Sequence, residues 1–157
     1  MCFSEAIDSL AMWSIYSNNS KAIMLETTDE EIFSLTVKGE LLEKHVGIFP
    51  VRYIEMLTLE EEIKAVFDIA SLNTTNIFKC KRAAFSHEEE WRAFVVGKID
   101  LKIEQPLKVP IADISKFIIN VLVHPSAPDW YVNTVKEFCL INKIAFQGKS
   151  RIFELVF

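Results

Sequence analysis

Ile114 to Val123, with the sequence ISKFIINVLV, is the stretch that most clearly decides the fold, because it is rich in the β-branched and aromatic residues that favour strands. After it, Ser126 is predicted to cap a helix that continues to about Asn142, with Pro128 in its first turn. Closing strands are predicted at Ala145-Phe146 and from Ile152 to Phe157. The C-terminal part of the chain therefore predicts a strand, a helix and further strands.

The rest of the chain alternates short strand and helix patterns, and no linker, repeat or low-complexity segment divides it. The mixture of hairpins and helical crossovers is typical of α+β proteins, so we predict one domain over residues 1–157, with a mixed, mostly antiparallel sheet and packed helices. The other predicted strands are Met1 to Ser4, Lys21 to Glu26, Val46 to Ile54 with an interruption at Pro50, and Glu89 to Val96, which a polar hairpin follows to about Val109. The predicted helices are Asp8 to Tyr16, a short one from Asp29 with Thr28 as cap and Gly39 as terminator, and one opened by a Thr58–Glu61 capping box that runs to about Leu72.

Composition excludes several classes of function. Half of the 157 residues are hydrophobic, which a disordered chain would not show. The formal net charge of −5 argues against a dominant electrostatic grip on nucleic acid or on an anionic membrane. The one basic cluster is followed at once by acidic residues: Lys79, Lys81 and Arg82 precede Glu88, Glu89 and Glu90.

The sequence also predicts a cytoplasmic protein without a membrane span. The longest uncharged stretch, Phe117 to Pro128, is shorter than the roughly 20 residues that a transmembrane helix needs. Cys2, Cys80 and Cys139 are odd in number and form no C-x-x-C pair, so neither a disulfide framework nor a zinc site is expected. The histidines show no ligand spacing and no phosphate-binding glycine loop is present, so we predict no metal and no cofactor.

Three short motifs resemble a bacterial family, the domain of unknown function 2971. The first is Cys2-Phe3-Ser4-Glu5 with Asp8, Leu10, Met12-Trp13 and Tyr16; the second is Phe49-Pro50-Val51 with Tyr53; the third is Lys79 with Phe85, Glu88, Glu90, Trp91 and Arg92. The run from Ile118 to Pro125 also looks similar to the family. The resemblance covers nearly the whole chain and implies a shared architecture more than any particular reaction.

Longer members that resemble this chain carry an earlier segment of the H-Y-[ST] type and an N-D-P-type loop. Together with the later E-x-E, these segments make the longer members look remotely like ADP-ribosyltransferases, which hold NAD over a sheet between an early His or Arg and a late Glu. This chain opens at Met1-Cys2-Phe3, so it offers no residue for the first histidine of that pattern. We therefore expect NAD chemistry to be absent from this short version.

Glu88 and Glu90 are the candidate catalytic residues. On a strand, residues two apart point to the same face, so the two carboxylates would repel and one pKa would rise, as in acid–base pairs. Trp91 would face the core, and Arg92 would return to the glutamate face to grip an anion or to hold Glu90. The alternative is a structural network of glutamate and arginine that only positions the strand.

Ser4, Trp13, Tyr16 and Arg92 are the candidate ligand-binding residues. Ser4 lies where a strand gives way to a helix, and the two aromatic residues could line a pocket with Arg92. The alternative is that Trp13 and Tyr16 are core aromatics with a bonded polar tip. The site hypothesis therefore requires the start of the chain and the segment before Trp91 to be neighbours.

The sequence leaves two hypotheses for the function of this protein. The leading hypothesis is a small accessory or binding domain without catalysis, which forms a homo-oligomer or binds a protein partner because an open strand edge must be paired or covered. The competing hypothesis is an ADP-ribosyltransferase-like or other nucleotide-binding enzyme that uses Glu88, Glu90 and Arg92. Only that second hypothesis implies NAD or another nucleotide.

Overall fold

The computed structural model describes residues 1–17, 19–38, 43–45, 47–55, 78–94 and 109–154. The chain divides into two compact units: unit 1 comprises Met1–Ile7 and Gly47–Phe94, and unit 2 comprises Asp8–Val46 and Val95–Phe157. The single domain over residues 1–157 stays a prediction. No helix in the described part of the chain has the length and hydrophobicity that a bilayer crossing requires.

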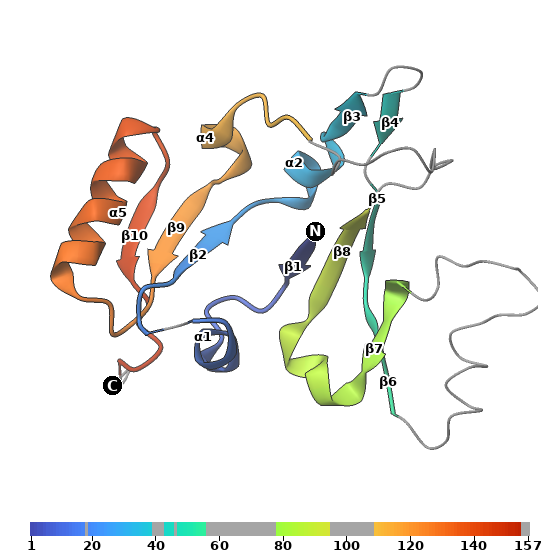
Figure 1. The fold of residues 1–157 in the computed structure, drawn as a ribbon, viewed down its shortest axis with the longest axis horizontal. Helices are drawn as coiled ribbons and strands as arrows, with labels where there is room; N and C mark the ends of the chain where they lie inside the picture. The colour runs from blue at the N-terminus through green and yellow to red at the C-terminus, as the bar shows by residue number, and fades with distance from the viewer. Residues whose placement is uncertain (18, 39–42, 46, 56–77, 95–108, 155–157) are drawn as a thin grey trace, which may run out of the picture. The chain divides into compact units, whose positions relative to one another are not determined.

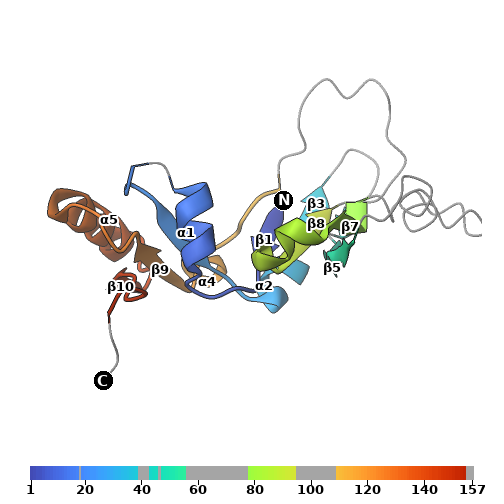
Figure 2. The ribbon, with the colours of Figure 1, turned by 90° about the horizontal axis from the view of Figure 1, so that it is seen from below.

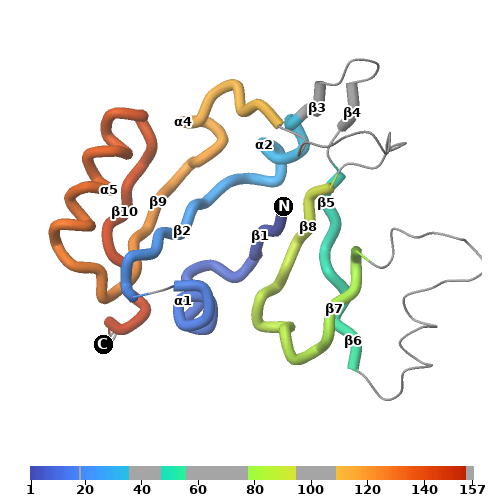
Figure 3. The backbone as a smooth tube through the Cα atoms, in the orientation of Figure 1, coloured from blue at the N-terminus to red at the C-terminus, as the bar shows by residue number. Residues whose placement is uncertain are grey.

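Unit 1 is built on a three-stranded antiparallel sheet with the order β1-β8-β5. Figure 3 shows β8 running between its two neighbours. A two-stranded parallel sheet joins β6 to β7, and a 3-10 helix, η2, connects β7 to β8. The bounds are β1 Cys2–Ser4, β5 Gly47–Pro50, β6 Arg52–Ile54, β7 Cys80–Arg82, η2 Ala83–Glu88 and β8 Glu90–Phe94.

Unit 2 contains a three-stranded sheet with the order β10-β9-β2, in which β10 is parallel to β9 and β2 is antiparallel to it. Helix α5 packs on β10 and β9, and it stands beside β10 in both ribbon views (Figures 1 and 2). A hairpin of β3 and β4 forms a separate small sheet. The bounds are α1 Leu10–Tyr16, β2 Ile23–Glu26, α2 Asp29–Phe33, β3 Thr36–Lys38, β4 Glu43–His45, α4 Ile114–Phe117, β9 Asn120–Val123, α5 Asp129–Ile141 and β10 Phe146–Lys149.

The core of unit 2 lies between α5 and its sheet. Val121, Cys139 and Ile144 form the buried cluster, and Val135 and Phe146 pack against it. Every residue of β9 is buried, because β9 is the central strand and has neighbours on both edges. This arrangement explains why the sequence of β9 is so strongly hydrophobic.

The structure confirms the α+β class, with mostly antiparallel pairing among the described strands. Where one sheet was expected, the described residues form several small ones. The strands predicted near Met1, Lys21 and Glu89 and the helix ending at Tyr16 are present, and Thr28 caps α2 as predicted. The predicted interruption near Pro50 separates β5 from β6.

Four details of the prediction were wrong. Residues 114–117 form helix α4 instead of a strand, because Asp113 accepts from the Ser115 N–H and caps a helical turn. Pro128 instead of Ser126 is the N-cap of α5. Helix α2 ends at Phe33, before Gly39, and residues 152–154 form a turn instead of a strand. The predicted helix from Thr58 and the polar hairpin after Val96 lie outside the described residues.

Candidate functional site

The candidate site begins with the pairing of β1 and β8 in unit 1. In this antiparallel register Ser4 lies opposite Glu90, and Cys2 lies opposite Arg92. Glu90 and Arg92 are two residues apart on β8, so their side chains share one face of the strand. The predicted proximity of the chain start and the acidic segment is therefore present within unit 1.

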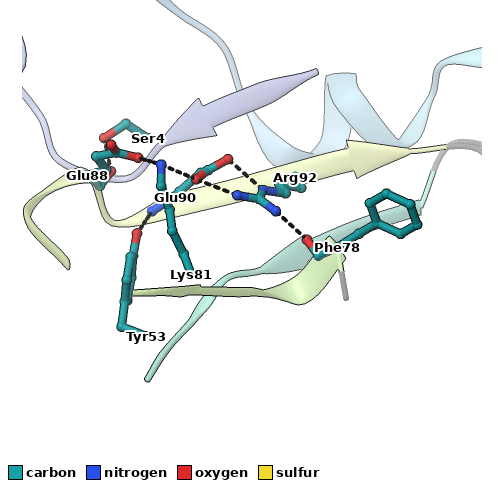
Figure 4. Close-up of polar contacts among 7 residues, drawn as sticks. All are labelled: Ser4, Tyr53, Phe78, Lys81, Glu88, Glu90 and Arg92. Atoms are coloured by element: carbon teal, nitrogen blue, oxygen red, sulfur yellow. Dashed lines mark hydrogen bonds and ion pairs between the residues drawn. The ribbon is translucent and has the colours of Figure 1, made fainter. Parts of the chain in front are cut away.

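Glu88 also lies at this site, but on a different secondary-structure element from the strand that was predicted. It is the last residue of η2 and not part of the strand. Glu89 follows in a left-handed conformation with φ 42° and joins η2 to β8. The hydroxyl of Ser4 donates to the Glu88 carbonyl oxygen at 2.6 Å, which fastens the end of η2 to β1 (Figure 4). Ser4 thus makes a backbone contact and holds the geometry of the site.

Arg92 donates hydrogen bonds to the Glu90 carboxylate from two of its nitrogens. Its Nε donates to Glu90 Oε1 at 2.7 Å, and its Nη2 donates to Glu90 Oε2 at 3.1 Å. A third donor, Nη1, bonds the Phe78 carbonyl oxygen at 2.8 Å, as Figure 4 shows. Such two-point contacts fix the orientation of both groups and are stronger than neutral hydrogen bonds.

Lys81 completes a group that we call the charged cluster: Lys81, Glu88, Glu90 and Arg92. From β7, the Lys81 Nζ donates to Glu90 Oε2 at 3.0 Å and forms a second ion pair with Glu88. Two carboxylates therefore meet two cations, and the formal charges cancel. The carboxylate side chains are only 7 % and 6 % exposed, whereas the two cations keep about a quarter of their side-chain surface exposed.

The second family motif also contributes to this site. The Tyr53 hydroxyl accepts a hydrogen bond of 2.6 Å from the backbone N–H of Glu90, at the first residue of β8. On the other side of the strand, the Trp91 indole N–H donates to Glu5 Oε2 at 3.0 Å. Residues from all three motifs that support the family resemblance therefore contact one another in unit 1.

The electrostatics of Glu90 differ from the prediction. Hydrogen bonding from Arg92, with further hydrogen bonds from Cys2 and Lys81, outweighs burial and lowers the pKa of Glu90 to about 2. The rise in pKa predicted for one carboxylate of the pair does not occur at Glu90, because the neighbouring cations outweigh the repulsion between carboxylates. A carboxylate with this pKa can accept hydrogen bonds at neutral pH but has no proton to donate.

The carboxylates of the charged cluster also shift the pKa values of its two cations and of the nearby Cys2 thiol. Burial alone would lower the pKa of Lys81, but hydrogen bonds to Glu88 and Glu90 raise it overall. The hydrogen bond to Glu90 raises the pKa of Arg92. Desolvation and then the hydrogen bond with Glu90 raise the pKa of the Cys2 thiol, which works against a nucleophilic role for Cys2.

Trp13 and Tyr16, the other predicted ligand-binding residues, belong to unit 2. Trp13 is buried; its indole N–H donates to Asp8 at 2.7 Å, and its ring meets His124 edge-on at 5.5 Å between centroids. Tyr16 is exposed at the end of α1. Arg92 belongs to unit 1, so a pocket that joins these aromatic residues to Arg92 stays a prediction.

Sequence reasoning missed Lys81 and Tyr53. Both come from the parallel pair β6–β7, in which Tyr53 lies directly opposite Lys81. The available signal was the basic cluster close to the glutamates, which indicates charge compensation but not which cation provides it. Among the described residues, no group of three His, Cys, Asp or Glu side chains is placed to hold a metal ion.

The chain belongs to the family described as protein of unknown function (DUF2971), whose model matches residues 12–93. The matched segment contains Tyr53 and the whole charged cluster, whereas the Cys2–Glu5 motif and the strands β9 and β10 lie outside it. A search of curated proteins and a search of solved structures found no match to this chain. Family membership therefore agrees with the motifs and adds no activity.

Proposed function

We propose that this protein is a binding domain without catalysis of its own, which acts in the cytoplasm by associating with protein. The observation that carries the proposal is the apolar surface of unit 2. Large apolar side chains are exposed on several of its elements, among them Ile23 and Leu25 on β2, and Trp130, Phe138, Leu140 and Ile141 on α5. Leu140 and Ile141 are 77 % and 79 % exposed, and neighbouring apolar side chains with such exposure are typical of protein interfaces.

The charged cluster supports the absence of catalysis. Both oxygens of Glu90 are engaged by Arg92 or Lys81, and the cluster carries no formal net charge. A general acid needs a pKa near the working pH, and the pKa of Glu90 lies far below that range. The geometry favours the alternative stated for these residues, a network that positions the strand.

A nucleotide-binding or ADP-ribosyltransferase-like function is the second candidate. The contact of Ser4 with Glu88, beside Glu90 and Arg92, favours it because these residues come from separate segments yet meet in one place. In that case Glu90 would act as a hydrogen-bond acceptor for a ligand hydroxyl. A ligand would have to displace Arg92 or Lys81 from the carboxylate, which is a substantial cost in free energy.

Two measurements on the full chain separate these functions. Light scattering at micromolar concentration should give a mass above the 18.0 kDa of one chain. A thermal-shift series with NAD, ADP-ribose and common nucleotides should leave the melting temperature unchanged, because only a ligand that binds the folded state raises it. A monomer whose melting temperature rises with NAD or another nucleotide would overturn the proposal in favour of the second candidate.

A further inference from the structure

We draw no further inference here: the strongest candidate, the exposed apolar face of helix α5 in unit 2, is already the basis of the proposed function, and nothing in the structure shows which partner covers it.

Discussion

Unit 1 buries a group of charged side chains, whereas unit 2 exposes apolar side chains along its helix α5. In unit 1, Glu88 and Glu90 are 5 % exposed and are neutralised by Lys81 and Arg92. In unit 2 the two most exposed large apolar residues, Leu140 and Ile141, lie on helix α5. The difference indicates that the charged cluster holds elements of unit 1 together, whereas the exposed apolar side chains of α5 are the basis of the proposed association with protein.

The largest effect is expected from removing the central acceptor of the charged cluster. Glu90→Ala leaves Arg92 and Lys81 partly buried without their shared partner, and breaking a buried ion pair costs roughly 3–5 kcal/mol. Urea unfolding should show a lower free energy of unfolding by that amount. Glu154→Ala, which removes the exposed pair with Arg151, is the control and should change stability by less than about 1 kcal/mol. Equal effects of the two variants would contradict the structural role of the cluster.

Acid should weaken unit 1 through the same carboxylate. The pKa of Glu90 is lowered from 4.5 to about 2 in the folded protein, so its stabilising contribution is complete above pH 4.5 and disappears as the pH falls toward 2. The free energy of unfolding should therefore fall by roughly 3 kcal/mol over this range. Glu90→Gln should show a flatter pH dependence. An unchanged slope in that variant would assign the acid sensitivity to other groups.

A smaller effect is expected at the polar contact that fastens α1 within unit 2. Asp8 accepts from the Trp13 indole N–H at 2.7 Å and from the Ser150 hydroxyl at 2.5 Å. Asp8→Ala leaves the buried indole N–H unpaired, so thermal unfolding should show a loss of about 1–3 kcal/mol. Asp8→Asn keeps an acceptor and tolerates the positive φ of this residue, so its loss should be smaller. If Ala and Asn cost the same, the hydrogen bond to Trp13 is not what stabilises this contact.

The smallest effect is expected at the cap of α2. The Thr28 hydroxyl accepts from the Glu31 N–H at 3.2 Å, and removing such a cap costs about 1 kcal/mol. Thr28→Ser keeps the hydroxyl and is the matched control for Thr28→Ala. Chemical denaturation should separate the two variants, with Thr28→Ser close to the wild type. A Thr28→Ser variant as unstable as Thr28→Ala would show that the methyl group of Thr28, not its hydroxyl, matters.

Elements with strong local signals could be predicted from the sequence. Thr28 carries its own capping signal, and the apolar run that contains β9 predicts a buried strand there. Residues 114–117 were misassigned because the apolar run was extended across a helical turn that Asp113 caps. The N-cap of α5 is Pro128 instead of Ser126, because the backbone of Pro128 is still extended and the helix begins only at Asp129.

The candidate site could be predicted only in part. The alternation along β8 placed Glu90 and Arg92 together, since that relation is local. Lys81 and Tyr53 could not be found in this way, because they reach Glu90 through the pairing of strands that are far apart in the sequence. The pKa of Glu90 depends on those same contacts, so a carboxylate pair read without its cations predicts a shift in the wrong direction.

Light scattering of the full chain over a range of concentrations tests the central claim most directly, because the claim is that exposed apolar side chains of unit 2 associate with protein. The mass at micromolar concentration should exceed the 18.0 kDa of one chain. Leu140→Glu places a charge on an exposed position of α5, so it should lower that mass while the circular dichroism spectrum stays unchanged. A mass of one chain at every concentration, or a mass that Leu140→Glu leaves unchanged, would contradict the account.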